Sequence, residues 1–469
     1  MVGTRKPRGD AFVIQTGLST LFAFLGALLL LILVHEWGHY WVARRVGVKV
    51  LRFSIGFGKP LWLTRRGADQ TEWVVGMLPL GGYVRMLDER EGDVAPEDLP
   101  RAFNRQSLGK RSAIVAAGPL ANFILALLLY WGLYLVGVPG LKPYVGTPAV
   151  GTLAAQAGFQ AGERILSVGQ EPVATWNEVQ LLLVDKALER ERVVLETQDD
   201  QGHVALHTID FSNLQLADRD AEVLDRIGLK PWDFPIPPKV GRVIADGAAA
   251  RAGIQPGDRI ETVAGSPLQS WQAFVTEVRQ HPDQALELTL SRQGQQVHLQ
   301  LTPRGERDGA GILVGKIGVA PQVDHELTKQ FWTTVQEPPV GALVHAVRKT
   351  WDMTRLTFKT FAAMLAGEAS LKNIGGPIQI ADYAGQTARL GAIPYLTFIA
   401  LISISLGAIN LLPVPLLDGG HLMYYAVELI KGSPVSDRML ALAQRVGLLL
   451  LTALMGFALY NDIQRLLTN

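Results

Sequence analysis

The chain has 469 residues, of which 48% are hydrophobic and 19% are charged. Its formal net charge of +1 argues against nucleic acid as a partner, and its low charge excludes an intrinsically disordered protein. The chain contains no cysteine, which excludes disulfides, thiolate metal sites and a cysteine nucleophile. Any metal must therefore be bound by histidine, aspartate or glutamate.

Three uncharged segments are long enough to cross a membrane as helices. Residues 11–34, 112–141 and 390–417 each exceed the roughly 20 residues that a bilayer requires. A fourth uncharged segment, residues 446–461, spans a bilayer only if its helix begins near Met439. The alternative is a buried core helix, which is hardest to exclude for this fourth segment. The sequence thus predicts a polytopic α-helical membrane protein with four transmembrane helices.

The loop between the first two segments sets the predicted orientation. It is rich in arginine and lysine, and basic loops stay in the cytoplasm. The N-terminal residues Arg5, Lys6 and Arg8 argue weakly for the opposite orientation. Because successive spans alternate in direction, residues 142–389 are expected outside the cytoplasm. The first and third spans then both end at the cytoplasmic side.

The extracytoplasmic region contains a repeat with an offset of 95 residues. Residues 157–165 match residues 252–260, and the same offset pairs Trp176 with Trp271. A sustained offset indicates two copies of one unit of about 90 residues, in which a glycine turn leads to a strand and then to a helix. The pattern resembles PDZ domains of bacterial proteases, which implies binding of extended chains by strand addition. Two α+β modules without a peptide role are the alternative.

Two further elements are expected close to the membrane. Residues 61–64 and 73–78 flank a polar turn and predict a β-hairpin, with another strand over residues 52–58. Residues 340–365 mix apolar and basic positions, which is typical of an amphipathic helix at the membrane surface. A helix packed on the second repeat, and a hairpin without substrate contact, are the alternatives.

The chemistry is concentrated in an HExxH motif at the end of the first span. Two histidines four residues apart lie on one face of a helix, so His35 and His39 can bind one zinc ion. Glu36 can then act as the general base on a water molecule at the metal. Polar side chains at the end of an apolar span are costly unless they have a function.

A zinc ion held by two histidines needs a third protein ligand. Asp418 follows the third span, which ends at the same side of the membrane as the first, so we expect it to be that ligand. His421 is the rival, with a structural role as the more favoured interpretation. Asn410 can hydrogen-bond the substrate or an oxyanion, or simply a neighbouring helix. Pro413 and Pro415 interrupt the helix beside a cavity.

These motifs together resemble the site-2 protease family of intramembrane zinc metalloproteases. HExxH in the first span, the run from Asn410 to Asp418 and residues 117–123 carry the resemblance, which covers nearly the whole chain. It implies that His35, His39 and Asp418 bind zinc and that Glu36 is catalytic. It also implies that Asn410, Pro413 and Pro415 belong to the substrate-binding segment.

The resemblance further implies substrates, partners and a location. Substrates would be single-span membrane proteins, such as an anti-sigma factor already cut outside the cytoplasm, or remnant signal peptides. Cleavage would belong to regulated intramembrane proteolysis in an extracytoplasmic stress response. The protein would lie among the lipids of the bacterial inner membrane, with periplasmic PDZ-like domains and an active site near the cytoplasmic side. The resemblance also implies a β element beside the active site.

Two other classes of function remain open. A membrane scaffold would use the PDZ-like pair to bind extracytoplasmic chain ends, and a metal transporter would line an ion path with histidine and aspartate. The expected organisation of the chain is as follows: residues 1–47, first transmembrane helix; 48–111, cytoplasmic-side loop with a membrane-associated β-hairpin; 112–141, second transmembrane helix; 142–230 and 231–325, PDZ-like domains; 326–389, amphipathic membrane-surface region; 390–438, third transmembrane helix and following segment; 439–469, fourth transmembrane helix and C-terminus.

Overall fold

The computed structural model describes residues 8–212, 226–232, 236–307, 312–322, 329–367 and 375–468. The chain divides into two compact units. One comprises Met1–Val138 and Val335–Asp462, and the other comprises Pro139–Thr334 and Ile463–Asn469. Arg5 and Lys6 lie outside the described residues, as do parts of the predicted ranges 142–230, 231–325 and 326–389.

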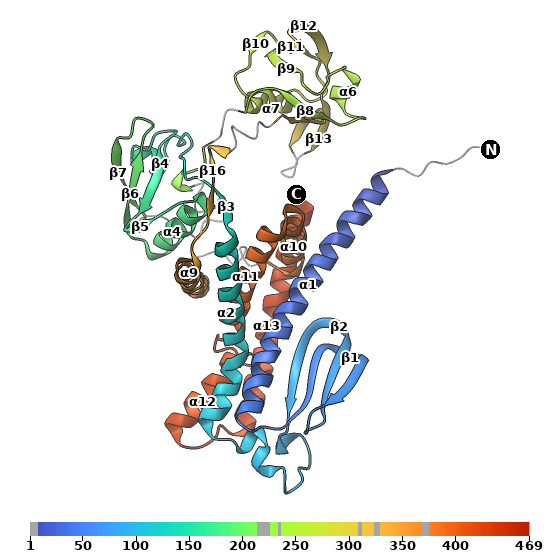
Figure 1. The fold of residues 1–469 in the computed structure, drawn as a ribbon, viewed down its shortest axis with the longest axis vertical. Helices are drawn as coiled ribbons and strands as arrows, with labels where there is room; N and C mark the ends of the chain where they lie inside the picture. Colours follow the sequence, from blue (N-terminus) through green and yellow to red (C-terminus); the bar gives the residue numbers. More distant parts are fainter. Residues whose placement is uncertain are drawn as a thin grey trace, which may run out of the picture. The chain divides into compact units, whose positions relative to one another are not determined.

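The first unit is built mainly from helices, and four helices in the described part of the chain are long and apolar enough to span a membrane. Their spanning parts are Gly17–Arg45, Leu108–Val136, Ala392–Asn410 and Arg438–Arg465. The helices of this unit are α1 (Arg8–Arg45), α2 (Leu108–Val136), α9 (Pro339–Leu365), α10 (Pro377–Leu390), α11 (Ala392–Asn410), α12 (Asp418–Lys431) and α13 (Asp437–Thr468) (Figure 1).

Small residues allow these helices to pack closely, as is usual in membranes. Gly38 of α1 faces the main chain of Ala117 in α2, where any side chain would overlap the Ala117 carbonyl. Gly385 of α10 likewise faces Thr20 of α1. Because α1 and α2 approach at Gly38, the HExxH motif lies directly against the second helix.

A β-sheet follows α1 in the chain. β1 (Val50–Arg66) and β2 (Thr71–Met86) pair antiparallel, but both strands bend and so provide four segments. Residues 71–76 lie between two segments of β1. They pair with residues 60–66 on one side and with residues 52–55 on the other. The last segment, residues 82–86, pairs only with the start of β1 and forms an edge of the sheet. The predicted hairpin residues thus lie within a larger sheet.

The bend requires glycine and leaves apolar side chains exposed. Gly56 has a φ of 87°, and a Cβ atom on Gly76 would lie 2.7 Å from the Gly56 carbonyl carbon. No other residue type fits both positions without strain. The large exposed apolar side chains of the bent strands are Phe57, Leu61, Trp62, Leu63, Val75, Met77 and Leu78.

The second unit contains the two copies of the repeat, and each has a four-stranded sheet of the same strand order. The order is β5-β4-β6-β7 in the first copy and β10-β9-β11-β12 in the second. Each copy also has its own buried core, around Trp176 in the first and Trp271 in the second. The matching strand orders show that the sequence offset reflects a structural repeat.

Shorter helices and strands make up the rest of the two units. The short 3-10 helices are η1 (Glu89–Glu91), η2 (Leu99–Arg101) and η3 (Phe103–Arg105). The second unit and its boundaries contain β3 (Val138–Leu141), α3 (Leu153–Gln156), β4 (Arg164–Val168), β5 (Glu171–Pro172), α4 (Trp176–Glu189), β6 (Arg192–Gln198), β7 (Val204–Asp210), β8 (Val240–Val243), α6 (Ala248–Arg251), β9 (Arg259–Val263), β10 (Ser266–Pro267), α7 (Trp271–Gln280), β11 (Leu286–Arg292), β12 (Gln295–Leu301), β13 (Arg304–Arg307), β14 (Leu313–Lys316), β15 (Val319–Pro321) and β16 (Trp332–Val335).

Candidate metal centre and active site

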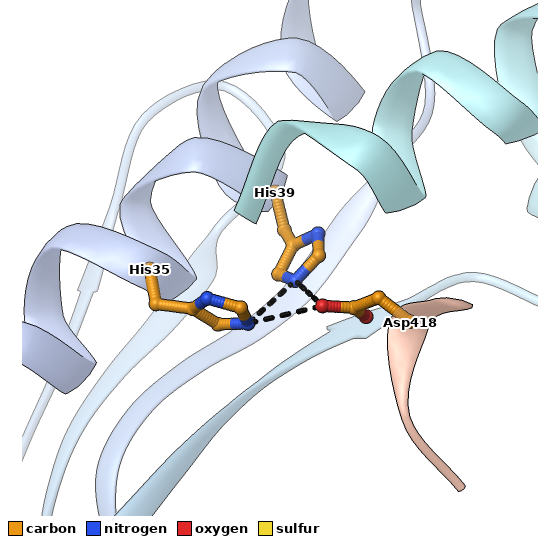
Figure 2. Close-up of side chains that lie close together, drawn as sticks. All are labelled: His35, His39 and Asp418. Atoms are coloured by element: carbon orange, nitrogen blue, oxygen red, sulfur yellow. Dashed lines mark hydrogen bonds and ion pairs between the residues drawn. The ribbon is translucent and has the colours of Figure 1, made fainter. Parts of the chain in front are cut away.

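Three side chains from distant parts of the sequence meet at one point, and we call them the metal cluster (Figure 2). His35 and His39 come from α1 and Asp418 comes from the first turn of α12. Their ligand atoms all lie within 4.8 Å of one another. The Asp418 Oδ2 atom is 3.2 Å from His35 Nε2 and 3.6 Å from His39 Nε2. Two imidazole nitrogens and a carboxylate oxygen are a donor set that suits zinc.

The end of α11 determines where Asp418 lies. The helix ends at Asn410, earlier than the apolar segment does, because Pro413 and Pro415 cannot continue a helical hydrogen-bond ladder. The chain then turns, with Leu416 at a φ of 85°, and α12 begins at Asp418. Neither proline lines the cavity at the metal cluster. Their effect on the site is to shape the turn that presents Asp418.

The second helix orients His39 through its main chain. His39 Nδ1 lies 2.8 Å from the carbonyl oxygen of Ile114, to which it can only donate a hydrogen bond. The proton is therefore on Nδ1, and the lone pair of Nε2 faces Asp418. A carbonyl oxygen that fixes the tautomer in this way is the usual partner of a metal-binding histidine.

Asn122 of α2 occupies the corresponding place behind His35. Its side-chain nitrogen is 3.2 Å from His35 Nδ1, while its Oδ1 atom is buried without a hydrogen-bond partner. Turning the amide by 180° keeps its shape and lets Oδ1 accept a hydrogen bond from His35 Nδ1. Both histidines then have the same tautomer with Nε2 free for a metal. The arrangement in which both Nε2 atoms can bind zinc therefore also gives the buried Asn122 Oδ1 atom a hydrogen-bond partner.

Gly118 provides the space for the two imidazoles. A Cβ atom on this residue would overlap His39 Nε2 and lie 2.9 Å from the His35 ring. Because both contacts are with ligand side chains, even an alanine here would displace His39. The second helix therefore supports the metal cluster in three ways. The Ile114 carbonyl accepts a hydrogen bond from His39, the Asn122 amide contacts His35, and Gly118 leaves room for both rings.

A cavity of about 470 Å³ opens at the metal cluster. Glu36 and Asn410 both line it, which brings these two predicted site residues beside the cluster. His421 also lines the cavity, with its ring edge-on to Tyr424 at a centroid distance of 6.0 Å. His421 is not a member of the metal cluster.

The edge segment of the sheet, residues 82–86, forms another wall of this cavity. Gly82 lies so close to Glu36 that a Cβ atom there would be 3.0 Å from Glu36 Cγ. The free hydrogen-bonding groups of an edge strand therefore lie beside the side chain expected to act as base.

Charged residues at the end of β2 and just after it also line the cavity. Arg85 pairs with Glu91 at 2.9 Å, and Arg90 donates to Asp88 through Nε at 2.9 Å. Burial raises the pKa of the Asp88 carboxyl, but hydrogen bonds from the Arg90 side chain and main chain outweigh it and hold the pKa below its usual range. The Asp88 carboxylate is thus anionic at neutral pH.

An ion pair fixes α12 to the start of α2. Arg111 contacts the Glu428 carboxylate through both terminal nitrogens, at 2.6 and 3.2 Å. Its guanidinium carbon also lies 5.0 Å from the centre of the Tyr425 ring. The Arg111 and Glu428 side chains are only 15% and 17% exposed, so the pair is largely shielded from water. This contact holds the helix that begins with Asp418.

Sequence reasoning did not single out the supporting residues of the site. Two signals were available: Asn122 is a polar amide inside an otherwise apolar span, and residues 117–123, which include Gly118 and Asn122, carry part of the family resemblance. Arg111 and Glu428 carry no such signal, because their importance depends on what they contact.

Comparison with known proteins points to the same chemistry as the geometry of the metal cluster. Residues 23–454 match the family described as "Peptidase family M50". The chain belongs to peptidase family M50. As a member of M50 the protein is a zinc metalloprotease, which confirms the predicted enzyme class and cofactor. Its four apolar helices make it a multi-pass protein of the inner membrane.

Several relatives align with this M50 protein over nearly their whole length. The regulator of sigma-E protease RseP from Escherichia coli is 43% identical over 448 residues, which are 95% of this chain and 98% of the relative. The protein of that name from Salmonella typhimurium is 43% identical over 446 residues, with the same coverage. A Neisseria meningitidis protein with the provisional name of zinc metalloprotease is 44% identical over 448 residues, 96% of this chain and 99% of the relative.

Proposed function

We propose that this M50 protease hydrolyses peptide bonds inside the transmembrane segments of single-span membrane proteins. The observation that carries this proposal is the position of the metal cluster. His35 and His39 lie within the spanning part of α1, Gly17–Arg45, and they meet Asp418 beside a cavity. A hydrolytic centre at this position is suited to a bond that lies at the membrane.

In the proposed site His35, His39 and Asp418 hold zinc. When bound, zinc polarises the scissile carbonyl and makes a water molecule more acidic. Ile114 and Asn122 keep the protons of the two imidazoles on Nδ1, away from the metal. The supporting helix thereby sets the protonation state that metal binding requires.

Glu36 is the proposed general base. Its carboxylate takes a proton from the attacking water and returns it to the nitrogen of the leaving amine. The side chain lines the cavity next to His35 in the sequence, and Gly82 leaves room for it.

Asn410, Pro413 and Pro415 form the proposed substrate-binding segment. The Asn410 amide lines the cavity and can donate a hydrogen bond to the substrate carbonyl or to the oxyanion that develops from it. Pro413 and Pro415 contribute indirectly, by keeping the segment before Asp418 out of a helix.

The edge segment 82–86 is the proposed acceptor of the unwound substrate. A helical substrate hides its peptide groups in internal hydrogen bonds, so it must extend before it can be cut. An edge strand can pair with that extended chain, and this one lies at the cavity wall. The exposed apolar residues around Trp62 support a membrane-associated position for the same sheet.

The remaining parts of the proposal concern partners and orientation. Close relatives are named for regulation of sigma-E, which supports an anti-sigma-type substrate in a stress response. The two repeat copies would be periplasmic PDZ-like domains that bind peptides or exclude bulky substrates. Helix α9 would lie at the membrane surface, since it exposes Leu343, Val347 and Trp351 along one stripe. The metal cluster would lie near the cytoplasmic side.

Cleavage of a trimmed single-span substrate by the purified full chain tests the function. We expect Glu36→Gln to lower the rate by about 10³-fold and to retain its zinc. The matched control is Glu97→Gln, which makes the same change at an exposed residue and should leave the rate unaltered. A zinc chelator should stop cleavage by the unchanged protein.

Each alternative gives a different result in this assay. Equal cleavage by the unchanged protein, by Glu36→Gln and in the presence of chelator would mean that another activity is responsible. Zinc-loaded protein that cuts no single-span substrate would overturn the substrate class while leaving the metal site intact. A scaffold would be insensitive to Glu36→Gln in its own function, whereas a metal transporter would need further polar residues through the middle of its spans.

A further inference from the structure

A second cavity, of about 240 Å³, lies between α1 and the β1–β2 sheet. Its walls are three aromatic rings, Tyr40, Trp62 and Trp73, and two arginines, Arg44 and Arg66, with Gly67 at the turn. None of these residues belongs to the metal cluster or lines its cavity. An aromatic cavity with two cationic side chains suits an anionic ligand that also has an apolar part.

The aromatic walls are held in place by other rings. Trp73 packs against Tyr40 and Phe53 with ring centroids 5.2 and 4.8 Å apart. Tyr40 also contacts Phe53 at 5.6 Å, in an edge-to-face arrangement. Such mutual packing fixes the rings before any ligand arrives, which lowers the entropic cost of binding. The Tyr40 and Trp73 walls of the cavity are therefore preformed in the fold.

The cavity keeps a net positive charge. Arg44 contacts Asp69 at 2.9 Å, but both oxygens of this carboxylate already accept hydrogen bonds from Arg101, at 2.7 and 2.8 Å. Arg101 also lies 4.0 Å from Asp98, which pairs with Lys49 at 2.5 Å, so three cations share two carboxylates. Arg66 is exposed and has no ion pair among the described residues. The charge of Arg66 and the excess positive charge beside Arg44 together give the cavity its net positive charge.

The cavity also lies where lipid headgroups are found. Arg44 is the last residue but one of the spanning segment Gly17–Arg45. Trp62 is 52% exposed and is flanked by Leu61 and Leu63, which are exposed as well. Arg45 follows Arg44 on α1, and its guanidinium carbon lies 4.9 Å from the centre of the Trp41 ring. Exposed tryptophan beside arginine at the end of a span is typical of the membrane–water interface.

We propose that this cavity binds the phosphate headgroup of an anionic phospholipid. Arg66 and Arg44 would contact the phosphate, and Trp62, which lies on the same face of β1 as Arg66, would pack on the glycerol region. The arginine fork matches the oxygens of a phosphate, and a basic residue near an anionic lipid contributes about fivefold in affinity. The site is separate from the active site and does not rest on the proposed proteolytic function.

Lipid binding to the full chain tests the proposal. The protein would be purified in a neutral detergent and titrated with dioleoyl phosphatidylglycerol or dioleoyl phosphatidylcholine, with bound lipids counted by native mass spectrometry. We expect at least one phosphatidylglycerol to bind about tenfold more tightly than phosphatidylcholine. Arg66→Gln should weaken phosphatidylglycerol binding about fivefold, and Trp62→Ala should weaken binding of both lipids.

Arg65→Gln is the matched control. It removes the same charge from the neighbouring residue of β1, but Arg65 pairs with Glu72 at 2.9 Å and does not line the cavity. The proposal is overturned if Arg65→Gln and Arg66→Gln weaken phosphatidylglycerol equally, or if the unchanged protein binds both lipids equally. Displacement of phosphatidylglycerol by excess inorganic phosphate would show a site for the free ion and would also overturn the lipid assignment.

Discussion

The metal cluster and the two repeat copies are built in opposite ways. Each copy has its own strand order and its own apolar core, formed by residues close together in the sequence. The metal cluster joins α1 to a helix that begins more than 370 residues later and depends on a few contacts with α2. A lost contact in a copy should therefore cost local stability, whereas a lost contact behind the cluster should cost zinc and activity. Changes at Gly118, Asn122, Arg111 and Asp258 test this contrast.

The largest effect is expected from Gly118→Ala. The added methyl group would overlap His39 Nε2 and displace this ligand. A displacement of about 1 Å at a catalytic group can cost about 100-fold in rate, so we expect such a loss together with a lower zinc content. The measurements are cleavage rate and zinc stoichiometry of the purified chain.

Gly132→Ala is the control for this variant. Gly132 lies in the same helix, but a Cβ atom there has no neighbour within 4 Å. Both variants gain the same helix propensity. If Gly132→Ala lost as much activity as Gly118→Ala, the effect would belong to the helix and not to the metal cluster.

Removal of the amide behind His35 should have the next largest effect. Asn122→Ala takes away the acceptor for His35 Nδ1, and loss of such a partner lowers metal affinity about 10- to 100-fold. Asn122→Asp keeps an acceptor and should retain most of the affinity, measured by competition with a fluorescent zinc chelator. If Asn122 instead donates to His35, the aspartate variant will be as weak as the alanine variant.

A smaller effect is expected from the Arg111–Glu428 pair. Arg111→Met leaves the Glu428 carboxylate shielded and unpaired, and it loosens the helix that presents Asp418. We expect zinc affinity to fall about threefold to tenfold. The double variant Arg111→Met with Glu428→Gln should recover part of this loss. Equal losses in the single and double variants would contradict coupling between the two side chains.

A change in the second repeat copy should leave the metal cluster unaffected. Asp258 is buried and contacts Arg292 at 2.8 Å. Burial raises the pKa of the Asp258 carboxyl, but hydrogen bonds from the Arg292 side chain and from the main-chain N–H of Gln255 outweigh it and lower the pKa overall. Asp258→Asn should therefore destabilise this copy by about 1–3 kcal/mol, measured by proteolysis of the full chain. Zinc content should stay constant.

The lowered pKa of Asp258 also determines how the contribution of its carboxylate to folding stability depends on pH. A carboxyl with a lower pKa in the folded state stabilises the fold fully above its ordinary pKa of about 4. The contribution disappears as the pH falls through the folded pKa. The difference between Asp258→Asn and the unchanged protein should thus be constant near pH 7 and shrink only in acid. A difference that changed between pH 6 and 8 would point to another group.

The sequence and the structure agree best where a pattern has a fixed geometry. The spacing of His35 and His39 and the parallel direction of two spans were enough to predict that Asp418 would lie beside both histidines. The bent sheet was only partly foreseen, because the folding of β1 back along β2 depends on Gly56 and Gly76 meeting. The supporting groups were missed for a similar reason. A glycine or an amide in an apolar span shows no function until its neighbour is known.

The place where the repeat copies enter the chain has an evolutionary consequence. β3 and β16, at the two ends of this region, pair with each other. Just beyond them, the Glu337 amide donates to the Tyr134 carbonyl at 3.0 Å. The two ends of an insertion of nearly 200 residues are thus already in contact. A short loop from α2 to α9 could replace the whole region at little entropic cost, so the protease core and the two repeat copies could be gained, lost or exchanged as separate genetic units.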